Sequence, residues 1–308
     1  MAKPEISIVI PIYNEEKTIQ ELFQRLTESL KGLDSEIVFV NDGSTDNSLN
    51  MLKKISEDDE SVLVVNFSRN YGQQAAILAG INYACGNYIV VMDGDLQDRP
   101  EEIPNLYKAI QDGHDIVFAV RKTRQDSWLK KTTSNWFSKI FNLLTSYKIQ
   151  TSMYLIMRER VANEIVRMEE HNRYFLGLLE YAGFEKHYLP VDRDARFAGE
   201  TKYSFMKMIR LAFDAITSFS NVPLKVATWT GFITATISFL SIFVLLYRKI
   251  FLNAAIEGWT SLAIIILFLF GLNFVFIGII GEYISRIFNE SKKRPLYIVE
   301  NTYQKDIQ

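Results

Sequence analysis

The chain has 308 residues, a formal net charge of −2 and one cysteine, Cys85. The near-neutral charge argues against an overall basic nucleic-acid-binding protein, and one cysteine excludes an intramolecular disulfide framework or a cysteine-based zinc cluster. This length accommodates one large domain with an appended segment.

Short apolar runs alternate with amphipathic segments over the first 120 residues. The first run, residues 6–12, is followed by polar residues 13–16 and not by a small-residue cleavage site, so it predicts a buried strand and not a signal peptide. Strands are predicted at 7–11, 36–41, 62–67, 88–92 and 115–120, and helices at 17–31, 46–56, 73–84 and 101–112. This alternation predicts an α/β domain built on a mostly parallel, doubly wound sheet.

Polar side chains gather where the predicted strands end, which is where ligands bind in such sheets. They are Asn14, Glu15, Asp42, Ser68, Arg69, Asp93, Asp95 and Arg121. The two carboxylates of Asp93 and Asp95 could approach one Mg²⁺ or Mn²⁺ ion, since such ions are held by few protein oxygens together with substrate phosphates. An ordinary Asp-Gly turn is the alternative at this position, and a helix-entry turn is the alternative at Asp42.

Two long uncharged runs lie near the C-terminus, at residues 226–247 and 258–281. At about 1.5 Å per residue each run reaches roughly 33–36 Å as a helix, enough to cross a hydrocarbon core of about 30 Å. Only residues 248–257 separate the runs, so we expect a transmembrane helical hairpin; buried core helices of a soluble protein are the alternative. More basic residues flank the hairpin than occupy its loop, which predicts that both chain ends face the cytoplasm.

A basic cluster precedes a second kind of apolar segment. Residues 121–139 carry a net charge of +5, and such a cluster attracts anionic lipid head groups. Residues 136–144 and 204–219 combine apolar and polar positions and predict interfacial amphipathic helices. The alternative is that both are helices that face the core.

Several motifs together resemble family 2 glycosyltransferases of the GT-A fold. They lie at residues 7–16, 40–46 and 93–98. Residues 68–73 and 196–205 look like those of the polyprenyl-phosphate glycosyltransferase branch, which includes dolichol-phosphate mannose synthase. Residues 124–128 and 281–287 are most similar to the undecaprenyl-phosphate 4-deoxy-4-formamido-L-arabinose transferase type. The likeness runs over about residues 5 to 300.

This resemblance implies roles for individual side chains. The residues implied to line the nucleotide pocket are Pro11, Tyr13, Glu15, Val40, Asp42, Asp93 and Gly94. Asp95 and Gln97 would bind Mg²⁺ or Mn²⁺. The residues implied to contact the phosphates of donor or acceptor, and with Asp95 to support catalysis, are Arg121, Arg196 and Lys202.

The sequence departs from the family pattern at a few positions. Gly94 stands where alanine is usual, and Arg99 replaces a proline. Met153 and Leu155 stand where many relatives have an acidic residue and an arginine. Loss of that acid need not remove a catalytic base, because a lipid phosphate with a second pKa of about 6 is already largely ionised at neutral pH.

We therefore expect a membrane-bound inverting glycosyltransferase that moves one sugar from a nucleotide donor, favoured to be UDP-linked, to undecaprenyl phosphate on the cytoplasmic face. The expected organisation is a catalytic domain at 1–200, an interfacial segment at 201–225, a transmembrane hairpin at 226–283 and a cytoplasmic tail at 284–308. The resemblance is compatible with a homo-oligomer, and a separate flippase would follow. A processive polysaccharide synthase and a non-catalytic anchored scaffold are the alternatives; the sugar stays open, and no nucleic-acid partner is expected.

Overall fold

The computed structural model describes residues 3–122, 152–168, 174–192, 194, 222–251 and 258–305. These residues belong to two compact units. The first holds the residues up to 194 and those from 294 onward, and the second holds 222–251 and 258–293. The predicted interfacial helices at 136–144 and 204–219 lie outside the described residues, as do Arg196 and Lys202.

An eight-stranded sheet forms the centre of the first unit. Its strands are β1 (Ile6–Ile12), β2 (Ser35–Asn41), β3 (Val62–Phe67), β4 (Tyr88–Val91), β5 (Ile116–Arg121), β6 (Leu155–Arg158), β7 (Lys186–Val191) and β8 (Val299–Tyr303). They lie in the order β7-β5-β6-β4-β1-β2-β3-β8. β1 pairs parallel with β2 and β4, β2 with β3, and β5 with β7, whereas β6 and β8 run antiparallel to their neighbours. The prediction of a mostly parallel sheet is confirmed.

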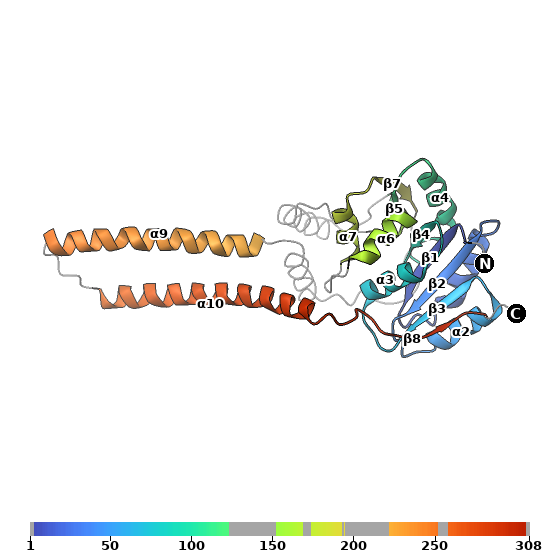
Figure 1. Ribbon diagram of the computed structural model, residues 1–308, viewed down its shortest axis with the longest axis horizontal. Coiled ribbons are helices and arrows are strands. Elements are labelled where there is room, and N and C mark those ends of the chain that lie inside the picture. The colour runs from blue at the N-terminus through green and yellow to red at the C-terminus, as the bar shows by residue number, and fades with distance from the viewer. Residues whose placement is uncertain are drawn as a thin grey trace. The chain divides into compact units, whose positions relative to one another are not determined.

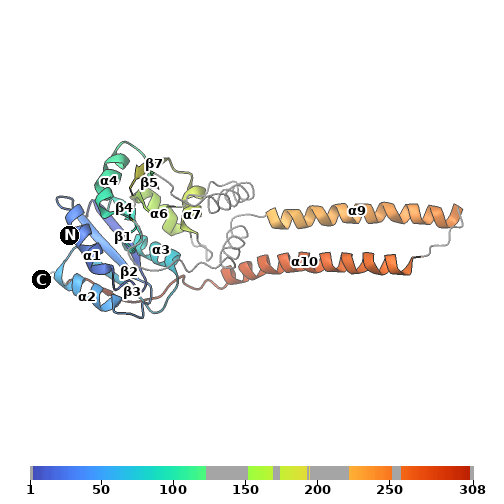
Figure 2. The ribbon, with the colours of Figure 1, turned by 180° about the vertical axis from the view of Figure 1, so that it is seen from behind.

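Helices cover both faces of this sheet, which Figures 1 and 2 show from opposite sides. One face packs against α1 (Ile19–Ser29), α2 (Ser48–Asp58) and α4 (Ile103–Gln111), and the other against α3 (Gln73–Tyr83), α6 (Glu159–Arg167) and α7 (Phe175–Ala182). A short 3-10 helix, η1 (Pro100–Glu102), precedes α4. β1 serves both cores, since Ile8 and Ile10 face the first set of helices and Val9 faces the second. Burial on both faces explains why the strands read as continuous apolar runs.

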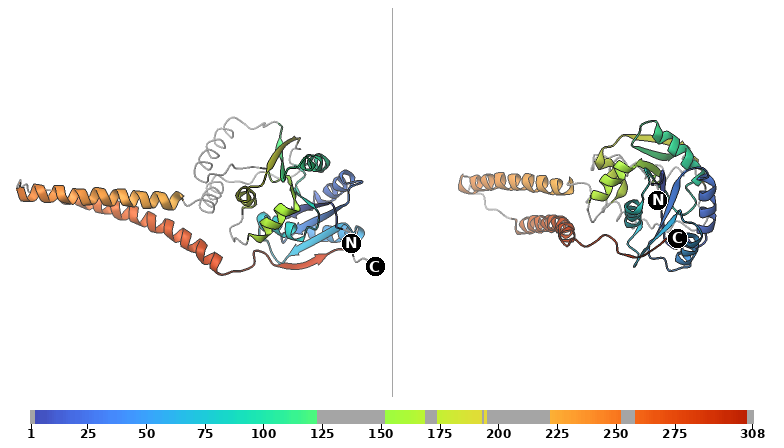
Figure 3. Two further views of the ribbon diagram at one scale, coloured as in Figure 1. Left: turned by 45° about the horizontal axis from the view of Figure 1, so that its top comes forward. Right: turned by 45° about the vertical axis from the view of Figure 1, so that its right-hand side comes forward.

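The last strand of the sheet comes from the end of the chain. β8 lies beside β3 (Figure 3), and its pairing is antiparallel. Just before β8, the Tyr297 ring stacks on the Phe67 ring with 5.0 Å between centroids, and the Ser68 N–H donates to the Ile298 carbonyl (3.1 Å). Sequence reasoning treated 284–308 as a tail and predicted no strand there. A five-residue strand at a sheet edge, whose three central residues are all exposed, carries no period-two pattern from which it could be predicted.

The second unit contains two long helices, α9 (Val222–Phe251) and α10 (Trp259–Ser291). They contact each other and run side by side (Figure 1). Large apolar side chains on both are exposed, including Phe232 at 66% and Phe268 at 69%. Within the described residues, one stretch, Phe268–Ser291, is long and apolar enough to cross a membrane. The transmembrane hairpin therefore stays a prediction.

The Tyr297 side chain provides a test of the β8 edge. We expect Tyr297→Ala to lower the free energy of unfolding by about 1–2 kcal/mol, because it removes an aromatic stack from a partly buried site. Amide hydrogen exchange in β3 should accelerate and the melting temperature should fall. The matched control is Ile298→Ala, since the Ile298 side chain is 52% exposed; equal effects of the two substitutions would contradict the assignment.

Candidate active site

Three loops meet at one edge of the sheet because the strands before them run parallel. Residues 13–18 follow β1, residues 42–48 follow β2 and residues 92–99 follow β4. The register aligns Ile12 with Asn41 and Val9 with Val91, so the three loops leave the sheet next to one another. Most of the polar side chains that were predicted to gather at the strand ends belong to these loops.

Reciprocal hydrogen bonds tie the loop after β1 to the loop after β2. The Asn14 side-chain oxygen accepts the Thr45 N–H (2.8 Å), and the Ser44 hydroxyl accepts the Asn14 N–H (3.0 Å). Asn14 has a φ of +56°, a left-handed conformation that asparagine tolerates better than most residues. The Ser48 hydroxyl accepts the Glu15 N–H (2.9 Å). These bonds fix the backbone that carries Tyr13 and Glu15.

Asp42 is a buried acid, with 2% of its surface exposed. Its two carboxylate oxygens accept the N–H groups of Tyr71 (2.6 Å) and Gly72 (2.9 Å) at the start of α3. The Asn70 side-chain amide donates to the Asp42 carbonyl (3.1 Å). Burial raises the pKa of the Asp42 carboxyl above its ordinary value, and the two backbone N–H groups offset part of this rise by stabilising the charged form.

Gly43 allows the loop after β3 to lie close to Asp42. Its φ is +65°, and a Cβ built there would lie 2.4 Å from the backbone carbon of Arg69 and 2.5 Å from the backbone nitrogen of Asn70. Any larger residue would push the 69–72 loop away from Asp42. Glycine is required here on both conformational and steric grounds.

Asp93 and Gly94 connect the loop after β4 to its neighbours. The Gln73 side-chain amide donates to the Asp93 carboxylate (2.6 Å), and the buried Asp98 carboxylate accepts the Asp93 N–H (3.3 Å). The Thr18 hydroxyl lies 3.0 Å from the Gly94 carbonyl and 3.1 Å from the Glu15 carbonyl. The loops after β1, β2, β3 and β4 are thus joined by a continuous set of hydrogen bonds.

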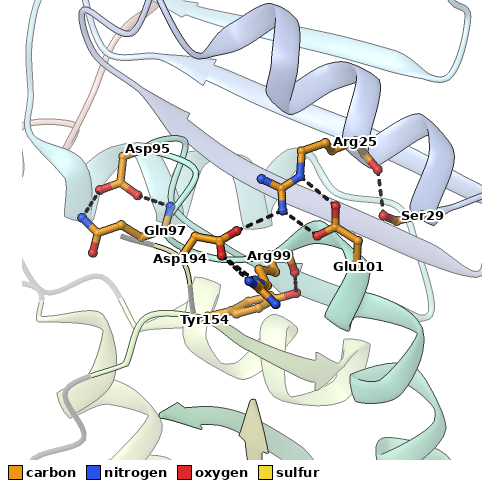
Figure 4. A network of polar contacts seen from close by, with 8 residues as sticks. All are labelled: Arg25, Ser29, Asp95, Gln97, Arg99, Glu101, Tyr154 and Asp194. Atoms are coloured by element: carbon orange, nitrogen blue, oxygen red, sulfur yellow. Dashed lines mark hydrogen bonds and ion pairs between the residues drawn. The ribbon is translucent and has the colours of Figure 1, made fainter. Parts of the chain in front are cut away.

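Asp95 and Gln97 form a compact turn (Figure 4). The Asp95 carboxylate accepts both the Gln97 N–H (3.1 Å) and the Gln97 side-chain amide (2.9 Å). Leu96 between them has a φ of +62°, which is uncommon for a bulky residue, and its side chain is buried. Strain of this kind persists where the surrounding structure enforces it, often at functional sites.

The donor set of this turn fits a hard divalent cation. Asp95 offers carboxylate oxygens and Gln97 an amide oxygen, the ligand type that Mg²⁺ and Mn²⁺ prefer. Among the described residues, no group of three or more His, Cys, Asp or Glu side chains forms a complete metal cage. A site with so few protein ligands suits an ion that keeps water and substrate phosphates in its coordination sphere.

The remaining predicted residues fall into three groups. Pro11 lies in β1, Tyr13 is 48% exposed beside it, and Val40 is fully buried in β2. Arg121 is the exposed last residue of β5. Arg196 and Lys202 belong to the part of the chain outside the described ranges. The roles assigned to all of these residues stay predictions.

Sequence reasoning missed the side chains that hold the site together. Gln73 and Thr18 looked like ordinary positions at or near a helix start, although each reaches a neighbouring loop. A second case is the buried Asn41, whose amide donates to the Asn66 side chain (2.7 Å), which in turn donates to Glu300 of β8 (3.0 Å). A polar residue inside an otherwise apolar strand was the available signal for Asn66, whereas Asn41 ends its strand and gave no such signal.

Comparison with known proteins identifies the protein family. The chain belongs to glycosyl transferase family 2, whose model matches residues 7–166. A solved structure of glucosyl-3-phosphoglycerate synthase from Mycobacterium tuberculosis, in complex with Mn²⁺, uridine-diphosphate and phosphoglyceric acid, covers 70% of this chain and 77% of its own, with a TM-score of 0.50 at 17% identity. The fold is thus the GT-A fold, and the protein is a glycosyltransferase.

Three relatives indicate the branch of this family to which the chain is similar. An uncharacterised glycosyltransferase of Bacillus subtilis is 42% identical over 97% of this chain and 94% of its own. The bactoprenol glucosyl transferase of Shigella phage SfV is 37% identical over 98% and 100%. The undecaprenyl-phosphate 4-deoxy-4-formamido-L-arabinose transferase of Proteus mirabilis is 34% identical over 96% and 93%. The predicted likeness to polyprenyl-phosphate glycosyltransferases is confirmed.

Asp42 gives the sharpest test of the predicted nucleotide pocket. The Tyr71 and Gly72 N–H groups donate to different oxygens of Asp42, so Asp42→Asn places an NH2 donor against one of them and breaks that hydrogen bond. We expect the dissociation constant for UDP with Mn²⁺ to rise about tenfold or more, as measured by titration calorimetry. Asp59→Asn, which changes an Asp that accepts the Ser61 N–H at the opposite end of β3, is the control. Unchanged UDP affinity in Asp42→Asn would remove Asp42 from the pocket.

Proposed function

We propose that this glycosyltransferase transfers a single sugar from a UDP-sugar to undecaprenyl phosphate, with inversion at the anomeric carbon. The observation that carries the proposal is the placement of the buried Asp42 and the Asp95–Gln97 turn on neighbouring loops at one sheet edge. A nucleoside diphosphate has a base and ribose at one end and phosphates at the other. Asp42 suits the base or ribose, and the Asp95–Gln97 turn suits a cation bound to the phosphates.

The relatives support the choice of acceptor. One is named for glucosyl transfer to bactoprenol and another for transfer to undecaprenyl phosphate, and each aligns with this chain over nearly its full length. Likeness of fold to a structure solved with Mn²⁺ and uridine-diphosphate is compatible with a uridine donor. The apolar α10 supports placement at the cytoplasmic membrane, where a polyprenyl carrier resides; a multi-pass arrangement with the catalytic domain in the cytoplasm is part of the proposal.

Each group of residues has a role in the proposed reaction. Asp42 orients the base or ribose, and the hydrogen-bonded loops around it keep the pocket in place before the donor binds. Asp95 and Gln97 would hold the divalent cation, which when bound neutralises charge on the departing diphosphate. Arg121 and, outside the described residues, Arg196 and Lys202 would balance the phosphate charge of donor or acceptor. Preorganised groups of this kind stabilise charge without reorganising during the reaction.

The acceptor supplies its own nucleophile in this scheme. Leu155 is fully buried at the start of β6, paired with Val91 and Phe118, and Met153 packs against the same apolar core. Neither side chain can accept a proton. A phosphate monoester with a pKa of about 6 carries its second charge at neutral pH, so it needs alignment at the anomeric carbon more than deprotonation.

The proposal is tested by incubating the purified protein with undecaprenyl phosphate, Mg²⁺ or Mn²⁺, and a panel of donors. The panel contains UDP-glucose, UDP-N-acetylglucosamine, UDP-galactose, UDP-4-formamido-arabinose and GDP-mannose, and mass spectrometry reads the lipid. We expect one donor to yield a glycosyl-phospholipid, with the product lost on chelation and reduced at least a hundredfold in Asp95→Ala. Product formation that survives both changes would contradict the assigned metal site.

The pH dependence tests the source of the nucleophile. If the acceptor phosphate attacks as its dianion, kcat/KM for undecaprenyl phosphate should fall about tenfold per pH unit below about pH 6, because protonation removes the attacking charge. A protein carboxylate acting as base would instead keep the rate flat down to about pH 4. Far-ultraviolet circular dichroism at each pH would confirm that the protein stays folded.

A further inference from the structure

The C-terminal segment that contains β8 contacts the end of β3 on both faces of the sheet. Phe67, the last residue of β3, packs in the core under α3, α6 and α7, whereas Asn66 lies on the face of Val64, toward α1, α2 and α4. The Tyr297 ring stacks on Phe67, and the Glu300 carboxylate accepts a hydrogen bond from the Asn66 side-chain amide (3.0 Å). The segment therefore holds the end of β3 from two sides.

A β-bulge directs Glu300 toward Asn66. Asn66 pairs with Asn301 and Phe67 pairs with Val299, so Glu300 is the extra residue of β8 between these two pairs. Bulges redirect a side chain in this way and are frequent beside active sites. The Asn66 side chain is buried, with 3% of its surface exposed, and its bond to a carboxylate satisfies a donor that is costly to bury unpaired.

Glu300 also sets the direction of a chain of two buried amides. A carboxylate only accepts, so Asn66 presents its NH₂ to Glu300 and its oxygen to Asn41, whose NH₂ donates to that oxygen (2.7 Å). This direction leaves the buried Asn41 Oδ1 without a partner among the residues that the structure describes. The two asparagines could bond to each other equally well with both amides reversed, so the observed direction depends on Glu300.

This polar chain ends beside Asp42. Asn41 and Asn66 are register partners at the ends of β2 and β3. Asp42 follows Asn41 directly, and the loop whose Tyr71 and Gly72 N–H groups bind the Asp42 carboxylate follows β3. The bond between Asn41 and Asn66 thus fixes the two strand ends relative to each other, at the point where the contact between the two loops begins.

A second route on the other face of the sheet reaches the same loop. The Tyr71 ring meets the Phe67 ring edge to face, with 5.7 Å between centroids, and Phe67 is the residue on which Tyr297 stacks. The Tyr71 N–H is one of the two donors to Asp42. Both routes lead from residues 297–300 to the groups that hold the Asp42 carboxylate.

We propose that Glu300 is a positioning residue for the nucleotide: through Asn66 and Asn41 it keeps Asp42 in place, and it couples the pairing of β8 to nucleotide affinity. The inference rests on the proposed function for the identity of the ligand. Glu300 need not touch the nucleotide. Because such a coupling is reciprocal, bound UDP stabilises the pairing of β8 by the same factor by which paired β8 raises UDP affinity.

The test uses the full chain with Glu300→Ala, Glu300→Gln and a control. Alanine removes the acceptor, whereas glutamine keeps an oxygen that can accept from Asn66. The control is Asn301→Ala, an exposed neighbour on the same strand. We expect Glu300→Ala to raise the UDP dissociation constant with Mn²⁺, and the KM for the donor, about fivefold with kcat unchanged. Glu300→Gln should restore most of the affinity.

The melting temperature separates positioning from general stabilisation. Glu300 is exposed, so the melting temperature of Glu300→Ala should match that of Asn301→Ala. Three results would overturn the proposal: UDP affinity in Glu300→Ala equal to that of the control, equal losses of affinity in Glu300→Ala and Glu300→Gln, or a loss of thermal stability that parallels the loss of affinity.

Hydrogen exchange distinguishes failure of this inference from failure of the proposed function, because it needs neither a donor nor an acceptor. In ligand-free Glu300→Ala, the Tyr71 and Gly72 amides should exchange faster than in Asn301→Ala, since Asp42 holds them less firmly. Equal exchange in the two variants would overturn the positioning role whether or not UDP binds. Absence of UDP binding by the wild type, with faster exchange in Glu300→Ala, would instead count against the proposed function.

Discussion

Parallel pairing of β1 with both β2 and β4 is the constraint on which the site depends. It brings the loops that begin at residues 13, 42 and 92 to one edge of the sheet, where side chains from distant parts of the sequence can meet. The apolar residues that bury both faces of β1 enforce this pairing. Hydrogen bonds among the loops then hold each acidic side chain in place, so the arrangement precedes any ligand.

The C-terminal strand β8 belongs to the same sheet and contacts residues that support the site. β8 follows α10 in sequence and pairs with β3, and its Glu300 joins the polar chain that runs through Asn66 to Asn41, the residue before Asp42. The backbone of the 69–72 loop, which holds the Asp42 carboxylate, begins where Ile298 accepts the Ser68 N–H. Residues after the apolar helices thus support the same loops as residues near the N-terminus.

Much of the core could be predicted from the sequence, because the hydrophobic patterns of its strands and helices are local. The strands at 6–12 and 62–67 and the helix starting at Gln73 are apolar or amphipathic runs bounded by polar turns, and the structure confirms them. β6, β7 and β8 were missed, since their pairing partners lie far away in the sequence and strands of four to six residues give little periodicity. Sequence distance also hid the ion pair between Arg99, in the loop after β4, and Asp194, because each residue looks like a surface charge until the fold brings the two together. A resemblance in motifs pointed to Asp42, Asp95 and Gln97, whereas the side chains that position them depend on tertiary geometry.

We propose that the loops after β2 and β4 together form one nucleotide and metal site. A structure of the wild-type protein in lipid with UDP and Mn²⁺ tests it most directly. We expect the metal to contact Asp95 and Gln97, and the uridine to lie beside Asp42. Uridine-diphosphate bound at another face of the sheet, or a metal held without Asp95, would contradict it.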